Sequence, residues 1–320
     1  MLSPLPAGYD QLNRYSSIVV DEALRRGISV EIVDPSTGEV VLTHGVRRVR
    51  TVQSLSELTS ALAFRVCDHK GLTREAFERA GLRVPEGRLA TFDDGDAEFL
   101  DRWGDIVVKP VRGEGGQGIT VGVTDRCHLA AALDAARAVC SEVLLERRHD
   151  GDDLRILVIA GEVVAASVRR PPTIVGDGRR TIAALTEELD RARSAATGGS
   201  SRVPLDATTA AVVAAAGFRF DDVLPAGVEL AVRRTANLHT GGTISDVTDR
   251  LHPELAAVAL RAAEVIGAPV LGLDLIVASV EGPDHVLIEA KEQPGLANHE
   301  PQPTAERFLD LLFPETATPP

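Results

Sequence analysis

Two acidic residues stand within apolar, strand-like segments near the C-terminal end of the chain. Asp274 lies in GLDLIV and Glu289 lies in VLIEAKEQPG. Because side chains alternate along a strand, Asp274 would point opposite to its flanking leucines and Glu289 opposite to Ile288. Two carboxylates on adjacent apolar strands are costly unless a cation lies between them. Mg²⁺ carried in with phosphates is one solution, and an ion pair with an arginine is the alternative.

A lysine follows the second carboxylate by two residues. Strict alternation places Leu287, Glu289 and Lys291 on one face of the strand and the apolar residues between them on the other. The Lys291 ammonium can pair with the two carboxylates or approach a phosphate, but it cannot coordinate a metal while protonated. A solvated lysine at the strand end is the structural alternative.

A glycine-rich stretch, IVVKPVRGEGGQGITVGV, has the composition of a phosphate-binding loop. Lys109 ends its first strand, and the loop contains Gly113, Glu114, Gly115, Gly116 and Gly118. Glycines let several backbone N–H groups turn toward one point, and such a nest suits a phosphate. The stretch is not a P-loop, because no GK[ST] ends it and no helix follows directly. A hairpin turn with Lys109 on a solvated face remains the alternative.

Three further segments carry polar candidates. LLERRHDGDDLRILV ends an apolar strand with Leu145 and Glu146 and places Asp153 at the start of the next, where acceptors for adenine or ribose could stand. Asp-Gly-Asp-Asp is also a turn sequence. Lys70, in CDHKGLTREAF, would by itself be a surface lysine. The third segment, AVRRTANLHTGGT, brings together Arg233, Arg234, Asn237, Gly241 and Gly242, which could clamp oxyanion and phosphoryl oxygens.

Regular elements must position these residues. The apolar periodicity predicts helices over residues 70–80, 125–140, 206–216 and 252–267, and a loop followed by an exposed helix within residues 176–196. It predicts strands over residues 105–111, 118–123, 142–146, 228–234, 270–277 and 285–290 and a hairpin over residues 154–170. A helix followed by a strand over residues 16–33 forms, with residues 38–52, a small N-terminal α/β unit. Strands and helices mix without regular βαβ alternation. This pattern favours an α+β enzyme of several subdomains over a Rossmann fold.

Composition narrows the function. The 320 residues carry a formal charge of −13, which argues against nucleic acid or an anionic membrane as partner but not against a small nucleotide. No apolar run reaches the roughly 18 residues that span a bilayer. The three cysteines match no metal spacing and are expected to be reduced, buried thiols. With no signal-peptide pattern at the N-terminus, we expect a soluble, cytoplasmic protein.

The motifs together resemble the ATP-grasp superfamily. DHKGLT, VVKPVRGEGGQG, LLERRHDGDD, RRTANLHTGGT, GLDLIV and IEAKEQPGLANHE occur in that family's order from about Ser56 onward. The chain is similar first to the ATP-grasp part of N-acetylglutaminylglutamine synthetases and next to the module of cyanophycin synthetase. The implied ATP-grasp fold has an N-terminal α/β subdomain (1–65), a central subdomain with a glycine-rich lid loop (66–147) and a C-terminal subdomain with the metal and substrate site (148–320).

The resemblance also implies residue roles. Lys70, Lys109 and the 113–118 loop would contact the ATP phosphates, Leu145 and Glu146 would lie at the adenine-binding hinge, and Asp153 would lie near the ribose. Asp274 and Glu289 would hold Mg²⁺, and Arg233 or Arg234 would steady an acyl phosphate. Arg155 and Arg169, on the expected hairpin, are secondary candidates. The family pattern at the last strand is Glu-x-Asn, whereas position 291 here is lysine. The resemblance therefore implies that Lys291 would replace one metal ion or weaken catalysis.

The implied activity is ATP-dependent joining of a carboxylate to an amine, forming an amide or peptide bond through an acyl phosphate. The expected substrates are amino acids or short peptides, with glutamine-like compounds among them, and the expected cofactors are ATP and Mg²⁺. A catalytically weakened nucleotide-binding sensor or scaffold is the alternative. Many ATP-grasp ligases dimerise, so a homodimer is also an expectation, although no sequence feature decides it.

Overall fold

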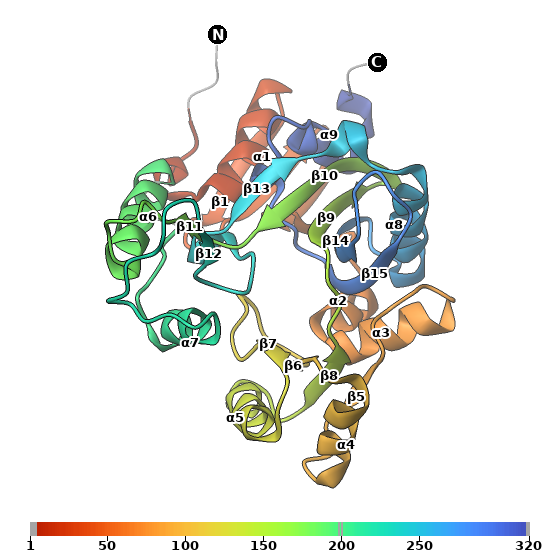
Figure 1. The fold of residues 1–320 in the computed structure, drawn as a ribbon. Coiled ribbons are helices and arrows are strands. Elements are labelled where there is room, and N and C mark those ends of the chain that lie inside the picture. The colour runs from red at the N-terminus through yellow and green to blue at the C-terminus, as the bar shows by residue number, and fades with distance from the viewer. Residues whose placement is uncertain (1–4, 198, 200, 318–320) are drawn as a thin grey trace. The chain divides into compact units, whose positions relative to one another are not determined.

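The computed structural model describes residues 5–197, 199 and 201–317, which form two compact units (Figure 1). Unit 1 comprises the described residues of Met1–Pro85, His149–Ser167 and Asp246–Pro320, and unit 2 comprises those of Glu86–Arg148 and Val168–Ser245. Each unit thus combines segments that are distant in the sequence, and each is described by itself. The three-subdomain division stays a prediction.

Unit 1 begins with a helix and a four-stranded antiparallel sheet. Its elements are α1 (Arg14–Arg25), β1 (Ser29–Asp34), β2 (Glu39–His44), β3 (Arg47–Val52) and β4 (Leu55–Ser56), and the sheet order is β1-β2-β3-β4. Helix α1 starts at Asn13, whose side chain accepts a hydrogen bond from the Ser16 amide. After the helix the chain turns at Gly27, which has a φ of +73°.

The second sheet of unit 1 carries the candidate carboxylates. Its strands are β9 (Asp152–Ile159), β10 (Glu162–Arg170), β13 (Thr243–Asp246), β14 (Val270–Val277) and β15 (His285–Lys291), in the order β13-β10-β9-β14-β15. The boundary between the units falls inside β10 and β13. Helix α8 (Pro253–Ile266) contacts β9 and β14, and helices α2 (Ala61–Asp68) and α3 (Lys70–Arg79) contact β15 (Figure 1).

One hydrophobic core joins the N-terminal and C-terminal parts of unit 1. It contains Val20 of α1, Leu42 of β2, Leu157 of β9 and Phe308 of α9 (Thr304–Leu312), all fully buried. Helices α1 and α9 pack against each other. The C-terminal helix therefore closes the core that the first helix begins.

Unit 2 contains two smaller sheets. The first has the order β5-β8-β6-β7 and is built from β5 (Gly87–Leu89), β6 (Ile106–Pro110), β7 (Thr120–Val123) and β8 (Val143–Arg147), with α4 (Asp94–Trp103) and α5 (Arg126–Arg137) packed in its core. The second pairs β11 (Thr173–Val175) with β12 (Glu229–Ala231) beside α6 (Ile182–Ala196) and α7 (Ala207–Ala215). The short 3₁₀-helices of the chain are η1 (Tyr9–Gln11), η2 (Leu238–Thr240), η3 (Thr248–Arg250), η4 (Leu296–His299) and η5 (Pro314–Thr316).

The predicted helices and strands are present, with shifts of a few residues at their ends. The sequence analysis did not predict three of the helices, namely α2, α4 and α9. Helix α2 has only eight residues, and α4 opens with Asp-Gly-Asp, which favours a turn locally. Asp93 nevertheless caps α4 by accepting from the Gly95 amide.

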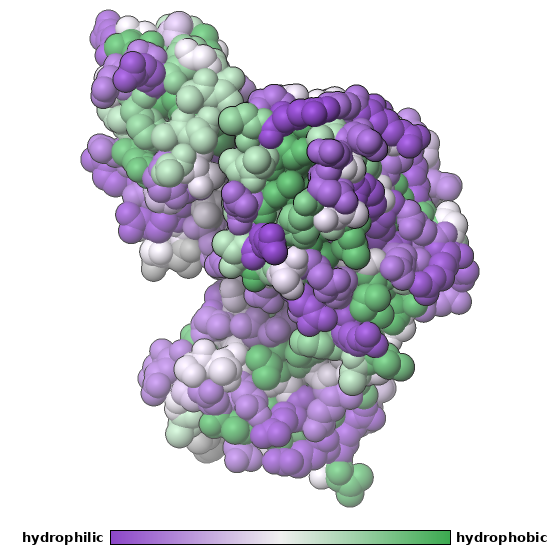
Figure 2. All heavy atoms as spheres, turned by 90° about the horizontal axis from the view of Figure 1, so that it is seen from below, coloured by the Kyte–Doolittle hydropathy of each residue, from purple (hydrophilic) through white to green (hydrophobic). Residues whose placement is uncertain are grey.

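The surface is mostly polar on one face. Hydrophilic residues predominate on the face shown in Figure 2, with hydrophobic residues in patches between them. No helix in the described part of the chain is long and apolar enough to cross a membrane.

The three cysteines differ in burial. All three are free, but only Cys67 is buried, so the expectation of three buried thiols is wrong for exposed Cys127 and half-buried Cys140. Burial raises the pKa of the Cys67 thiol to about 12.

Replacing Phe308 by alanine should destabilise unit 1. Its ring is fully buried between the two ends of the chain, and such a truncation typically costs about 3–5 kcal/mol. Urea unfolding followed by circular dichroism would measure the loss. Phe64→Ala, at a half-exposed phenylalanine of α2 (41% exposed), is the matched control and should cost much less. Equal losses would contradict the core assignment.

Candidate active site

Three charged residues form one row across the second sheet of unit 1. Asp274 of β14 is the direct register partner of Arg155 on β9 and of Glu289 on β15. Because register partners point to the same face of a sheet, the three side chains lie together. Arg155 grips Asp274 with two nitrogens, Nε against Oδ1 and Nη2 at 2.9 Å from Oδ2. The arginine pair that the sequence left as an alternative to a metal is therefore formed.

Two lysines meet on Glu289. The Nζ atoms of Lys70 and Lys291 each lie 2.9 Å from Glu289 Oε1. Lys70 is the first residue of α3, and the preceding residue, His69, caps that helix by accepting from the Leu72 amide. Lys70 is buried, so it is a site residue and not the surface lysine that its local sequence allows. Two carboxylates thus face three cations.

Glu289 and Lys291 both stay charged at neutral pH. Burial would raise the pKa of Glu289, but the ammonium groups of Lys291 and Lys70 outweigh it and hold that pKa below its usual 4.5. Burial likewise would lower the pKa of Lys291, and the Glu289 carboxylate outweighs it, so that pKa lies above 10.5. The Lys291 side chain is only 29% exposed. It is therefore part of the cluster and not a solvated strand end.

A bulge in β15 changes which residues share the polar face. Asp274 pairs with Glu289 but the next residue, Leu275, pairs with Leu287, so Ile288 is an extra residue without its own partner. Val286 and Leu287 are consequently both buried, whereas Ile288 and Glu289 are both half-buried. The predicted strict alternation over residues 286–291 is wrong at this point. Such bulges re-aim side chains, often beside active sites.

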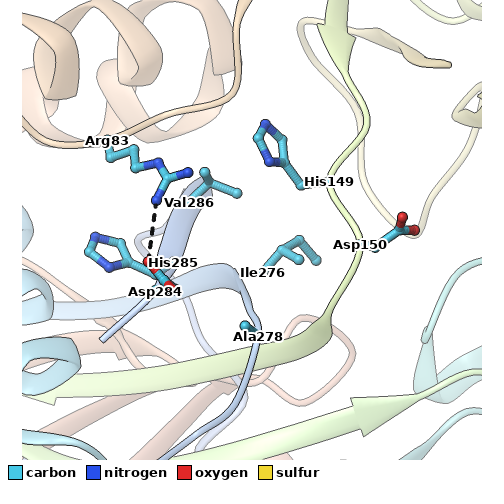
Figure 3. A pocket seen from close by; sticks show the side chains of 8 residues that line it. All are labelled: Arg83, His149, Asp150, Ile276, Ala278, Asp284, His285 and Val286. Carbon is cyan, nitrogen blue, oxygen red and sulfur yellow. Dashed lines mark ion pairs between the residues drawn. The ribbon is translucent and has the colours of Figure 1, made fainter. Parts of the chain in front are cut away.

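A pocket lies on the same face, one row further along β14. Ile276, two residues beyond Asp274, pairs with Asp153 of β9 and Val286 of β15. Beyond this row, a cavity of about 270 Å³ is lined by Arg83, His149, Asp150, Ile276, Ala278, Asp284, His285 and Val286 (Figure 3). Arg83 Nη1 lies 3.9 Å from Asp284 Oδ1. In the view of Figure 3 the Asp150 carboxylate points away from the other side chains.

The sequence analysis missed this pocket, although Asp153 was a candidate. Ile276 and Val286 looked like ordinary core residues of apolar strands. The available signal was the spacing, since Ile276 follows Asp274 by two residues and must share its face. Arg83 and His149 lie in connecting segments, and only the folded chain brings them to the strand ends.

In unit 2, two predicted residues pair with each other. Lys109 Nζ lies 2.6 Å from Glu146 Oε2, and both side chains are buried. Lys109 is therefore not on a solvated face. Leu145, beside Glu146 on β8, is fully buried in the core of this unit.

The glycine loop of unit 2 contacts the segment that follows β12. Its glycines at 113, 115, 116 and 118 have φ values of +130°, +66°, +79° and +68°, which other residues rarely adopt. Asn237 Nδ2 donates a hydrogen bond of 2.7 Å to the Gly115 carbonyl. Exposed Glu114 lies within this loop. Asn237 thus holds the loop backbone.

The remaining candidates of unit 2 lie in several different surroundings. Arg233 pairs with Asp206 at 2.6 Å, and Asp206 caps α7 by accepting from the Thr209 amide. The exposed Arg234 lies over Gly122, where an added Cβ would stand 2.2 Å from Nη1. Gly241 and Gly242 form a tight turn after η2. The two glycines lie in contact with Val203 and with the backbone of residues 236–237, and an added Cβ would be 2.2 Å from Val203 Cγ2 at Gly241. Arg169, on β10, is half-buried.

The candidates consequently form two groups. Unit 1 brings together Lys70, Asp153, Arg155, Asp274, Glu289 and Lys291, and unit 2 contains Lys109, Leu145, Glu146, the glycine loop and the 233–242 segment.

Comparison with known proteins defines the class. Residues 83–193 match the ATP-grasp domain of prokaryotic glutathione synthetase. The fold resembles the bifunctional glutathione synthetase of Pasteurella multocida, with a TM-score of 0.66 and 22% identity over 96% of this chain and 44% of that one. It also resembles D-alanine–D-alanine ligase of Bacillus anthracis, with a TM-score of 0.51 and 15% identity over 81% of this chain and 70% of that one. The segment 83–193 is thus similar to an ATP-grasp domain, and the predicted α+β fold is confirmed.

Within that class the sequence has particular relatives. It is 33% identical to cyanophycin synthetase of Trichormus variabilis over 311 residues, 92% of this chain. It is 28% identical to the glutathione biosynthesis bifunctional protein of Clostridium perfringens over 96% of this chain. The chain spans 34% of the first relative and 42% of the second. Similarity to cyanophycin synthetase is confirmed, and similarity to N-acetylglutaminylglutamine synthetases stays a prediction.

Removing the arginine of the charged row should destabilise unit 1. In Arg155→Met, the buried Asp274 carboxylate loses both guanidinium hydrogen bonds, a change that typically costs about 3 kcal/mol or more. Thermal and urea unfolding would measure the loss. The control is Arg250→Met, which removes an ion pair to Glu281 with both side chains mostly exposed and should cost less than about 1 kcal/mol. A loss of unfolding free energy no larger than the control's would contradict the prediction that Arg155 stabilises the buried Asp274 carboxylate.

Proposed function

We propose that this protein is an ATP-dependent carboxylate–amine ligase. The observation that carries the proposal is the charged row of unit 1, in which two register-paired carboxylates are surrounded by Arg155, Lys70 and Lys291. Such a row can neutralise a polyphosphate and hold a divalent cation with it. The similarity of the chain to cyanophycin synthetase and to the ATP-grasp domain of glutathione synthetase supports the same reaction class.

The reaction needs little covalent chemistry from the protein. A substrate carboxylate attacks the γ-phosphoryl group of ATP, ADP leaves, and an amine then displaces phosphate from the acyl phosphate to form an amide. Catalysis of such transfer rests on positioning and charge neutralisation. Lysine and arginine side chains in a water-poor site supply both, and excluding water protects the acyl phosphate from hydrolysis.

The carboxylates of the row fit Mg²⁺. Proteins usually bind Mg²⁺ with one or two carboxylates and leave further positions to water and substrate phosphates. Asp274 and Glu289 provide that pair, and across the residues described there is no group of three or more His, Cys, Asp or Glu side chains that would form a complete cage. These two residues would hold the ion, which neutralises phosphate charge when bound.

Successive rows of side chains along β14 change from charged to apolar, in an order that suits the phosphates, ribose and base of a nucleotide. We place the phosphates at the row of Asp274 and Glu289, and the ribose at the next row, where Asp153 stands opposite Ile276. Consecutive rows on one face lie about 7 Å apart. The base would enter the pocket beyond, with Ile276 and Val286 as its apolar floor and Arg83 and His149 at its polar edge.

For unit 2 we propose the roles that the motifs imply. Lys109 and the 113–118 loop would bind phosphate oxygens, and an adenine hinge at Leu145 and Glu146 is the alternative to the pocket of unit 1 as the place of the base. Arg233 and Arg234, with Asn237, Gly241 and Gly242, would steady the acyl phosphate, and Arg169 would be secondary. The Lys109–Glu146 and Arg233–Asp206 pairs hold two of these cations in fixed positions.

The substrates we propose are an amino acid or short peptide as carboxylate and another as amine, with glutamine-like compounds among them. The curated relatives bear the names of cyanophycin synthetase and a glutathione biosynthesis protein. We further propose a cytoplasmic location and a homodimer.

A nucleotide-binding sensor or scaffold of low activity is the second candidate. The ion pair between Lys291 and Glu289 favours it, because an ammonium group occupies an oxygen of the proposed metal ligand. ATP would then bind without substrate-dependent turnover.

Incubation with ATP, Mg²⁺ and a panel of amino acids and short peptides should release ADP in a substrate-dependent manner. Mass spectrometry should find a product joined through an amide bond. Lys70→Met should abolish the stimulation, because it removes a cation from the phosphate row. Arg261→Met, at an exposed arginine of α8, should leave it unchanged. If ATP binds while no mixture raises ADP release above the ATP-only rate, the ligase proposal fails and the sensor remains.

Narrowing the pocket should weaken nucleotide binding. In Ile276→Trp, the larger ring would fill part of the cavity, and we expect the Kd for ATP to rise about tenfold or more, equivalent to about 1.4 kcal/mol. Calorimetry would measure it. Val46→Trp, at a fully exposed position, is the matched control. An unchanged Kd for Ile276→Trp would place the base elsewhere.

A further inference from the structure

The three cations of the charged row are not equivalent. Arg155 engages both oxygens of Asp274, whereas Lys70 and Lys291 share the single oxygen Oε1 of Glu289. In this row two carboxylates face three cations. Either lysine alone would balance the charge of Glu289, so Lys291 can also face charge that a ligand brings while Lys70 stays beside Glu289.

Lys291 lies on β15, the same strand as Glu289. It pairs across the sheet with Gly272, which has no side chain to compete for the space. A Cβ at position 272 would lie 2.9 Å from Pro294 Cβ and 3.4 Å from Arg155 Nη1. The ammonium of Lys291 therefore reaches back along the face to Glu289, and its side chain is mostly buried.

A carboxylate that bridges two Mg²⁺ ions must offer an oxygen to each of them. Oε1 of Glu289 already lies 2.9 Å from each of two ammonium nitrogens. A second divalent ion at this oxygen would have to displace an ammonium or lie beside it, and like charges at such distances repel strongly. A single ion would be held by Asp274, which Arg155 engages at both oxygens, and by Glu289, and it would neutralise phosphate charge without a second ion at Oε1.

We propose that the ammonium group of Lys291 replaces a second divalent cation, so that the site binds its nucleotide with a single Mg²⁺. This inference rests on the proposed nucleotide site and adds the metal stoichiometry to it. Lys291 then acts as a fixed monovalent counter-charge for the phosphates. The nucleotide-bound site would then form at a lower concentration of free Mg²⁺ than a site that needs two metal ions.

The test is to count bound metal on the full chain without turnover. Mn²⁺ is titrated into protein saturated with a non-hydrolysable β,γ-imido analogue of ATP, and bound ion is measured by electron paramagnetic resonance. We expect one Mn²⁺ per chain for the parent protein and two for Lys291→Asn, which exchanges the ammonium for an oxygen ligand. Lys291→Met removes the charge without adding a ligand. It should keep one Mn²⁺ and bind the analogue about tenfold or more weakly, as expected for a lost hydrogen bond from a charged group.

Two results would overturn the inference, namely two Mn²⁺ ions on the parent protein or a single ion on Lys291→Asn with the analogue bound. Calorimetry of the analogue itself separates this failure from failure of the nucleotide site. If the parent protein does not bind the analogue at all, the proposed function falls, and the inference falls with it.

Discussion

Charge compensation across three adjacent strands is the constraint on which the site depends. Asp274 and Glu289 face each other on a mostly buried sheet face, and burying two carboxylates together is costly without nearby cations. Arg155 comes from β9, Lys70 from the start of α3, and Lys291 from the end of β15, the strand that also carries Glu289. Each cation is therefore placed by a different element, and the row forms only when the sheet and helix α3 have packed together.

The same arrangement links stability with the proposed chemistry. Buried ion pairs contribute little net stability when complete, but removing one partner leaves a costly charge. The groups suited to phosphates and a metal ion are thus the groups whose loss the fold tolerates least. The three cations of the row also favour the binding of an anionic ligand there. Further along β14 the face becomes apolar at Ile276, so a single strand leads from charged groups to a pocket.

Much of the fold could be predicted from local patterns. Helices such as α3 and α8 and strands such as β14 have strong periodicity and clear caps, and they appear where expected. Helix α2 is short, α4 starts with turn-forming residues, and the apolar face of α9 has meaning only against α1. Those three needed tertiary contacts to be recognised, because propensity is a weak guide when packing decides the conformation.

The sequence by itself determined the residue types of the site, the order of its motifs and the pairing of GLDLIV with VLIEAKEQPG, since these follow from alternation and from motif spacing. The tertiary structure alone decided three things. The bulge at Ile288 set which residues of β15 share the polar face, Lys70 and Lys291 met on one oxygen of Glu289, and Arg83 and His149 reached the pocket beside Ile276. Each is a contact between segments distant in the chain or a local break in strand register. Local periodicity carries no information about either.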